Sequence, residues 1–448
     1  MNRRGFALLL LAWAFLASGS IGALKPAKAA RPNILLIVSD DQRWDTIQAL
    51  GNPEIRTPNL DRLVARGFRF NNAYCMGSMI GAVCLPSRTM LITGRSLWRI
   101  PANPRAKVAP EGVPLLPVLL NQAGYATFHC GKASNSCTFA NAAFKVNLET
   151  KGRTAESARE HADKVLAFLN ERDRTKPFFV YLAPPVPHDP RLAAPEFVAQ
   201  YPPDKITLSR NFLPRHPFDN GELEVRDELL APHPRTPDVM RQHVADYYAT
   251  IAQLDHEVGR IIDDLQRRKL LESTVVIFTS DQGLAVGGRH GLMGKQNLYE
   301  HVKPPLVFAG PDIPHGESDA LVYLFDLFPT ICDLAGVTTP PVVEGRSLLP
   351  IITGRQAKVR DWLLGAYRDC QRMIRDQRWK LIAYRAADGR HTQLFDLQND
   401  PDELNNLVDD LRYAEQRKRL EQLLTKARRE FADPVDFDAP FDRPAVKP

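Results

Sequence analysis

Cysteine is scarce in this sequence, and its basic residues are not gathered into blocks. Six cysteines in 448 residues are too few for a disulfide scaffold, which uses cysteine at much higher density. The chain has 58 Lys and Arg against 52 Asp and Glu, a formal charge of +6, which suits an anionic substrate without requiring one. It has no zinc-finger spacing, RNA-binding aromatic signature or basic helix, so nothing supports nucleic acid binding.

The amino terminus differs in kind from the rest. Arg3 and Arg4 precede an apolar run from Phe6 to Leu16, and Ala27-Lys28-Ala29 has the small-x-small pattern of a cleavage site. We therefore predict a secretory signal peptide over residues 1–29 and a periplasmic or secreted protein. A retained anchor is the alternative, but the run is too short to span a bilayer comfortably, so no stable membrane span is expected after signal removal. The arginine pair leaves Sec and twin-arginine export both open.

Short apolar runs rich in branched residues alternate with helical patterns, which is typical of an α/β sheet. The expected strands are residues 33–38, 125–130, 178–182 and 274–279. Helices are expected from Ser157, with Glu160 completing a capping box, and over residues 238–271. Residues 184–237 are proline-rich and aperiodic, which predicts a long excursion over the sheet edge that could line a substrate cleft. Its basic side chains are possible contacts for an anionic sugar: Arg215, His216, Arg226, His233 and Arg235.

The chain is longer than one compact domain usually is. After Gly354 the pattern changes to short strands at 379–384 and 394–397, followed by a charged helix at 412–429. We predict a catalytic domain over residues 30–354 and a smaller α+β subdomain with antiparallel strands over residues 355–448. No internal repeat is present.

Polar residues follow each expected strand at its carboxyl end, the edge at which open α/β sheets bind ligands. Taken singly, each could be a turn former or a helix cap. Four of them supply only oxygen ligands, which favour calcium or magnesium over zinc. A cation there would polarise a sulfate or phosphate oxygen. The oxygen ligands are Asp40, Asp41, Asp281 and Gln282, and the two further polar residues are Lys132 and His188.

The sharpest signal is Cys84-Leu85-Pro86-Ser87-Arg88, which runs on to Thr93-Gly94. Pro86 is placed to open a helix, leaving Cys84 at its N-terminal edge, where free amides and the helix dipole favour an anion. Arg88, one turn on, adds a planar cation suited to an oxyanion. A thiol there could be a nucleophile. A soft sulfur is nevertheless a poor neighbour for a hard cation, and an oxygen nucleophile would fit better.

This C-x-P-S-R sequence resembles the signature of the formylglycine-dependent sulfatases, within the alkaline phosphatase superfamily. The resemblance extends in order along nearly the whole mature chain and is most similar to iduronate-type and other sugar sulfatases. The further motifs include Arg31-Pro32-Asn33-Ile34, Thr57-Pro58-Asn59-Leu60-Asp61, Gly131-Lys132, Pro187-His188, Thr279-Ser280-Asp281-Gln282-Gly283, His290-Gly291 with Lys295, and Leu394-Phe395-Asp396-Leu397. It implies an alkaline-phosphatase-like mixed sheet sandwiched by helices, with a smaller C-terminal α+β subdomain.

The resemblance also implies a mechanism for hydrolysing a sulfate ester on a carbohydrate or another sulfated molecule. A formylglycine-generating or anaerobic sulfatase-maturing enzyme would oxidise Cys84 to formylglycine, whose hydrate attacks sulfur. One Ca²⁺ would be held by Asp40, Asp41, Asp281, Gln282 and residue 84. Lys132 and Lys295 would grip the sulfate, Arg88 would steady the hydrate, and His188 would protonate the departing alcohol.

The sequence departs from the family pattern in two ways. Ser134 and Asn135 stand where a histidine commonly follows the Gly-Lys pair, so either another base serves, for which the nearby His129 is a candidate, or turnover is slow. Gln282 stands where asparagine or histidine is more usual. Separately, Cys130 and Cys137 could form a disulfide, but their spacing does not require it.

Two other functions remain open. One is phosphodiester or phosphonate hydrolysis on the same superfamily fold, against which a single cation site argues. The other is a catalytically silent protein that binds sulfated glycans, suggested by the missing histidine. The intact cysteine motif and the full set of metal ligands argue against it.

Overall fold

A computed structural model describes residues 31–437, 439 and 441 of the chain. The signal peptide predicted for residues 1–29 lies outside the described residues. Across the part that is described, no helix is both long and apolar enough to cross a membrane.

The main sheet has eight strands in the order β5-β4-β6-β1-β7-β8-β2-β9. Strands β4, β5, β6, β1 and β7 pair in parallel, β8 runs antiparallel to β7 and β2, and β2 pairs in parallel with β9. The strand bounds are β1 Asn33–Ser39, β2 Phe68–Tyr74, β4 Ala126–Lys132, β5 Val146–Thr150, β6 Phe178–Ala183, β7 Thr274–Ser280, β8 Leu306–Ala309 and β9 Gly316–Tyr323.

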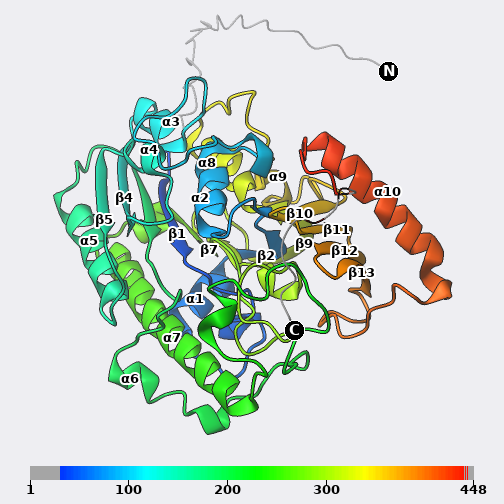
Figure 1. The fold of residues 1–448 in the computed structure, drawn as a ribbon. Helices are drawn as coiled ribbons and strands as arrows, with labels where there is room; N and C mark the ends of the chain where they lie inside the picture. Colours follow the sequence, from blue (N-terminus) through cyan, green and yellow to red (C-terminus); the bar gives the residue numbers. More distant parts are fainter. Residues whose placement is uncertain (1–30, 438, 440, 442–448) are drawn as a thin grey trace, which may run out of the picture. The chain divides into compact units, whose positions relative to one another are not determined.

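Helices cover both faces of this sheet (Figure 1). Ile34, Leu36 and Val38 of β1 pack into one apolar layer with helices α2, α3, α4, α8 and α9, while Leu35 and Ile37 pack into the other with α1, α5 and α7. Both faces are therefore buried, which explains why β1 is apolar throughout. The helix bounds are α1 Pro58–Arg66, α2 Cys84–Thr93, α3 Leu116–Gln122, α4 Thr138–Asn141, α5 Ser157–Glu171, α6 Pro195–Val198, α7 Pro237–Arg267, α8 Leu327–Ala335 and α9 Leu349–Ile352.

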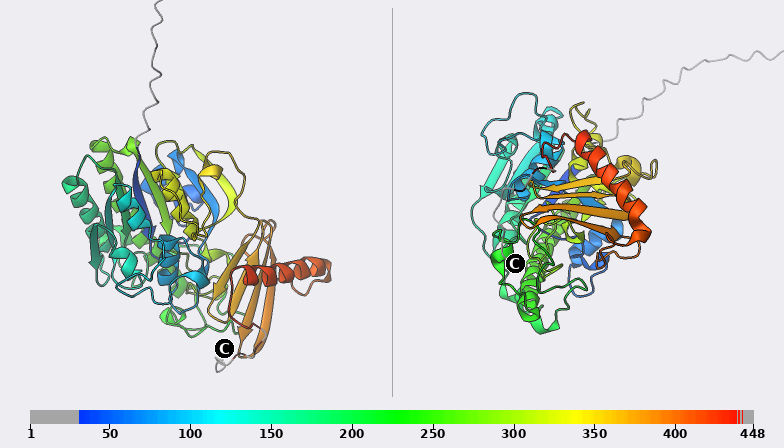
Figure 2. Two further views of the ribbon diagram at one scale, coloured as in Figure 1. Left: turned by 90° about the horizontal axis from the view of Figure 1, so that it is seen from above. Right: turned by 45° about the vertical axis from the view of Figure 1, so that its right-hand side comes forward.

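A second sheet of five strands has the order β13-β12-β11-β10-β3. Helix α10 (Ala414–Glu430) lies across it (Figure 2) and buries Leu420, Leu424 and Ala427 in the same apolar cluster. Strand β3 pairs in parallel with β10, and a Cβ at Gly77 would lie 1.8 Å from the Ala366 carbonyl oxygen, so this approach needs glycine. The bounds are β3 Gly77–Ser78, β10 Leu363–Tyr367, β11 Gln371–Arg375, β12 Trp379–Ala386 and β13 Gly389–Asp396.

The structure confirms the α/β fold, the mixed sheet between helices and all four strands expected in the main sheet. The strands expected at 379–384 and 394–397 fall within or at the end of β12 and β13. The domain boundary near residue 355 stays a prediction. Between β6 and the start of α7 at Pro237, the helical elements of the excursion are α6 and short 3₁₀ turns at Pro203–Lys205 and Glu228–Leu230.

Three local expectations need correction. Ser157 is the first residue of α5, and its hydroxyl accepts from the Thr154 amide at 2.9 Å, so the capping box with Glu160 is wrong. The long helix ends at Arg267 instead of residue 271, and α2 begins at Cys84 instead of Pro86. All six cysteines lie within the described residues and are free thiols, so Cys130 and Cys137 are not bridged.

Candidate active site

The acidic floor of the site follows two neighbouring strands. Ser39 of β1 pairs with Ser280 of β7, so Asp40, Asp41 and Asp281 leave the sheet side by side. The Asp41 amide donates to Asp281 Oδ1 at 3.0 Å, and all three carboxylates are buried. Asp41 has a φ of 71°, an uncommon conformation for a non-glycine residue that clusters at functional sites. The sequence therefore places three carboxylates at one point of the sheet edge.

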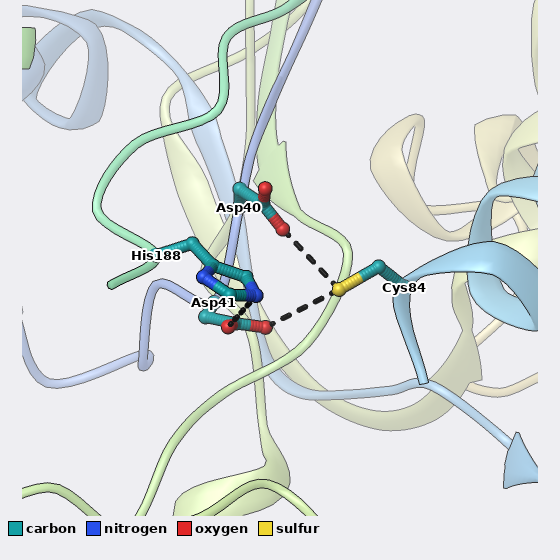
Figure 3. Close-up of side chains that lie close together, drawn as sticks. All are labelled: Asp40, Asp41, Cys84 and His188. Carbon is teal, nitrogen blue, oxygen red and sulfur yellow. Dashed lines mark hydrogen bonds and ion pairs between the residues drawn. The ribbon is translucent and has the colours of Figure 1, made fainter. Parts of the chain in front are cut away.

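Cys84 faces this floor from the start of α2. Its Sγ lies 3.3 Å from Asp40 Oδ1 and 3.6 Å from Asp41 Oδ1 (Figure 3). Burial raises the pKa of the Cys84 thiol well above its usual value, and the charges of Asp281 and Asp41 raise it further. The thiol is therefore protonated, and a thiolate is disfavoured at the centre of this site.

Each carboxylate has a buried cation beside it. Lys132 Nζ lies 2.5 Å from Asp40 Oδ2. Lys295 Nζ donates to Asp41 Oδ2 at 2.7 Å and to Cys84 Sγ at 3.3 Å. The third pair is Arg88 with Asp281, where Nε donates to Oδ2 at 2.9 Å. Three opposite charges thus compensate the acids around position 84.

The charges and burial around the site shift the pKa values of Asp40 and Asp281 in opposite directions. Burial alone would raise the pKa of Asp40, but the charges of Lys132, Arg88 and Lys295 outweigh it and hold that pKa well below its usual value. For Asp281, burial and the neighbouring Asp40 charge raise the pKa. Arg88 keeps two buried nitrogens, Nη1 and Nη2, without a hydrogen-bond partner in the described chain. Such orphaned donors are expected where an anion is to bind.

His188 follows β6 and reaches the same point from the opposite side. Its Nδ1 lies 2.8 Å from the Asp189 carbonyl oxygen, and Nε2 lies 3.6 Å from Asp41 Oδ2. The carbonyl can only accept, so Nδ1 carries a proton and Nε2 faces the site. Burial and the nearby Lys295 charge lower the pKa of His188 to about 3. The resting ring is neutral.

The donor set fits a hard cation. The ligand atoms of Asp40, Asp41, Cys84 and His188 all lie within 4.8 Å of one another, and all four residues are buried. The Asp281 oxygens accept from the Asp41 amide and from Arg88. Two of these four residues are carboxylates, and with the adjacent Asp281 they supply the hard oxygen donors that calcium or magnesium requires. Gln282 is also buried, and its side-chain nitrogen lies 3.5 Å from the Lys295 carbonyl oxygen.

A cleft of about 460 Å³ opens onto the site. Sequence reasoning missed three of its side chains: Arg153, Asp227 and Gln296. Arg153 Nη2 lies 3.7 Å from Asp40 Oδ2, and Asp227 Oδ2 lies 3.8 Å from Lys295 Nζ. No local motif marks them, because they stand on irregular segments that only the folded chain brings here. The other lining residues are Gly81, Ala82, Ser134, Asn135, His188, Val225, Arg226 and Lys295.

Of the basic residues suggested in the excursion, Arg226 lines the cleft. His216 is buried between the Phe218 carbonyl and the Tyr299 hydroxyl, and Arg235 is buried against Glu228. Neither these two nor Arg215 and His233 are among the cleft-lining residues.

His129 is not placed to act as the missing base. It hydrogen-bonds Asn147 at 2.6 Å and packs against the rings of Phe144 and Tyr181. The hydrogen-bond partners of Cys84 are instead Asp40, Asp41 and Lys295.

Comparison with known proteins identifies the family. The family model for Sulfatase matches residues 32–337, and that for the C-terminal region of N-sulphoglucosamine sulphohydrolase matches residues 288–430. The N-acetylglucosamine-6-O-sulfatase of Bacteroides thetaiotaomicron is 26% identical, with 95% of this chain and 91% of the relative covered.

Two solved structures share the fold. One is a protein solved in complex with its own substrate, D-glucosamine-2-N,6-O-disulfate. It aligns to this chain with a TM-score of 0.75 and 24% identity, covering 91% of this chain and 99% of that chain. The other is the phosphonate monoester hydrolase of Agrobacterium radiobacter, with a TM-score of 0.73, 20% identity, and 90% and 96% covered. Since the Sulfatase match alone spans more than half of the sequence, the chain belongs to the sulfatase family and is a sulfuric ester hydrolase.

Proposed function

We propose that this enzyme removes a sulfate ester from a sulfated sugar, with a formylglycine made from Cys84 as nucleophile and one bound Ca²⁺. The observation that carries the proposal is the position of Cys84, whose thiol lies between Asp40, Asp41 and Lys295. Surrounding carboxylates disfavour a thiolate, whereas a neutral oxygen group would sit well among hard donors and ammonium groups. The sugar is proposed because the relatives named above act on sulfated glucosamine.

Asp40, Asp41, Asp281, Gln282 and residue 84 are the proposed holders of the cation. When bound, Ca²⁺ would polarise a sulfate oxygen and offset the charge of the carboxylates. Lys132 and Lys295 contact Asp40 and Asp41 and are the proposed groups that hold the sulfate oxygens beside the cation.

The aldehyde at position 84, once hydrated, would supply a hydroxyl nucleophile and a second hydroxyl through which sulfate is expelled. Around it, Lys295 Nζ lies 3.3 Å from Cys84 Sγ and can orient the scissile sulfate over this atom. Arg88 fixes Asp281 through Nε, and its Nη1 and Nη2, which make no hydrogen bond within the described residues although Nη2 lies 3.7 Å from Asp40 Oδ1, can donate to developing negative charge.

His188 is the proposed proton donor to the leaving alcohol. Its Nδ1–H is fixed by the Asp189 carbonyl, so only Nε2 can serve the reaction. A proton must first reach Nε2, because the resting ring is neutral. Binding of an anionic sulfate raises the proton affinity of a buried imidazole, which couples substrate binding to the arming of the acid.

The phosphonate hydrolase on the same fold gives the one competing function with an observation behind it. Turnover of glucosamine 6-sulfate, an aryl sulfate and an aryl phosphonate, measured side by side on matured enzyme, separates the two. We expect the sulfates to be hydrolysed with the higher kcat/KM. Preference for the phosphonate, or binding of the sulfated sugar without any turnover, would contradict the proposal.

Export and maturation complete the proposal. The predicted signal peptide over residues 1–29 supports a periplasmic or secreted enzyme, with a mature catalytic domain and a C-terminal subdomain that begins near residue 355. The C-x-P-S-R motif at Cys84 supports a formylglycine-generating or anaerobic sulfatase-maturing enzyme as partner.

A further inference from the structure

Three residues of the irregular segment, Arg226-Asp227-Glu228, contact both the loop that carries His188 and the loop that carries Lys295. We call these three residues the latch. Arg226 pairs through both terminal nitrogens with the carboxylate of Asp189, with Nη1 3.0 Å from Oδ1. Because Asp189 follows His188 directly, this end of the latch fixes the loop of the proposed proton donor.

The middle of the latch contacts the other loop at the lysine itself. Asp227 Oδ2 accepts from Gln296 Nε2 at 2.8 Å and lies 3.8 Å from Lys295 Nζ. Asp227 therefore faces the Lys295 ammonium with an opposite charge while its hydrogen bond fixes the next residue, Gln296, and it helps to hold Lys295 in place.

Glu228, the last latch residue, binds the main chain that immediately precedes Lys295 in the sequence. The Glu228 carboxylate accepts from the Met293 amide at 2.9 Å and from the Gly294 amide at 2.8 Å. Its partner Arg235, 2.5 Å away, donates from Nε to the Gly291 carbonyl at 3.0 Å. Both members of the ion pair thus bind the main chain of residues 291–294.

This pair is costly to bury. The side chains of Glu228 and Arg235 are each 0% exposed. Burial raises the pKa of Glu228 in spite of Arg235 and the two backbone amides, so desolvation is not fully offset. A buried ion pair is weak evidence for stability, and apolar residues often replace one without loss. What this pair supplies instead is a fixed place for the loop: a Cβ at Gly294 would lie 2.8 Å from Glu228 Oε1, so the main chain is pressed against the carboxylate.

We propose that Glu228, held by Arg235, is a positioning residue that sets Lys295 Nζ over position 84, and that the latch joins this placement to that of His188. The inference rests on the proposed role of Lys295 in gripping sulfate. The catalytic lysine would then be placed by a segment with no regular secondary structure over most of its length.

A double-mutant cycle tests the proposal. We expect Glu228→Gln to lower kcat/KM for a small aryl sulfate by about 10- to 100-fold, mainly in kcat, because a misplacement of about 1 Å has effects of that size. A small aryl substrate is used so that contacts between a sugar and the cleft do not affect the measured kcat/KM. In a Lys295→Ala background, Glu228→Gln should cost less than about 3-fold more, since residues that act through one another are not additive. Losses that multiply in full would overturn the proposal.

Two further variants keep the test decisive. Asp433→Asn breaks the equally buried pair between Arg372 of β11 and Asp433, which follows α10, and should lower Tm without changing kcat/KM. If Glu228→Gln does not fold, Arg235→Lys takes its place in the cycle. Lysine keeps the positive charge but cannot donate to both the Glu228 carboxylate and the Gly291 carbonyl as arginine does. Wild-type turnover is measured first, because an inactive matured wild type contradicts the proposed function. An active wild type whose kcat is unchanged by Glu228→Gln or Arg235→Lys contradicts the positioning role alone.

Discussion

The two halves of the active site are built by different means. The inner half stands on strand ends, where the parallel pairing of β1 and β7 brings Asp40 and Asp281 together, and on the start of α2, which carries Cys84. The outer half stands on the irregular segment, where ion pairs and backbone hydrogen bonds hold Arg226 and Asp227. The inner half is set by packing, and the outer half by charges that other segments must complete. Substitutions in the inner half should therefore abolish the reaction, and those in the outer half should tune it.

The largest effect is expected at the nucleophile. Cys84→Ala should reduce sulfate release to less than about one-thousandth of wild type, because no other group replaces a covalent nucleophile. The variant should keep its far-UV circular dichroism and Tm, since alanine fits where cysteine packs as a small residue. Sulfate release is measured by ion chromatography. Ordinary turnover in this variant would end the formylglycine proposal.

The next effect is expected at the carboxylate shared by the cation site and Arg88. Asp281→Asn should lower kcat/KM by about 100- to 1000-fold by weakening the proposed cation site. It also removes the nearer carboxylate of the buried Arg88 and leaves it only Asp40 at 3.7 Å, which costs up to about 3–5 kcal/mol of stability. Activity and calcium content are measured together on refolding-competent protein. Asp433→Asn is the control, because it breaks an equally buried pair away from the cleft. An active Asp281→Asn enzyme with full calcium content would contradict the assignment.

Removing the bound calcium should also lower turnover, but reversibly. Dialysis against a chelator is expected to lower turnover at least about 10-fold and to lower Tm, because an ion that binds only the folded state stabilises it. Calcium should restore both, and the fully active enzyme should contain about one calcium per chain. Turnover that persists at less than one-tenth of that content would show that the cation is not required.

The smallest effect is expected in the outer half. Arg226 is 58% exposed at the side chain, so Arg226→Ala should raise KM for a sulfated sugar by about 3- to 10-fold, as rim charges do, and should lower kcat only slightly, because the same side chain also pairs with Asp189 beside His188. Arg210→Ala is the matched control, because Arg210 is a still more exposed arginine of the same segment paired with Asp402. Equal effects of the two variants would remove the outer half from substrate binding.

What could be predicted from the sequence follows the same division. Asp40, Lys132 and His188 lie at or shortly after the carboxyl ends of apolar strands, so local pattern and the geometry of parallel strands bring them together. Asp227 could not be found this way, because its position depends on contacts with Gln296 and Lys295, about seventy residues on in the chain. Where only a local rule was available, at Ser157, the chain entered the helix one residue earlier than the capping pattern requires.

The central claim is that position 84 carries an oxygen nucleophile made from cysteine. Mass spectrometry of the proteolytic peptide that spans Cys84, from protein expressed together with a formylglycine-generating enzyme, tests it most directly. The account predicts an aldehyde or its hydrate in place of the thiol. A thiol that persists under conditions which convert a control sulfatase would contradict it.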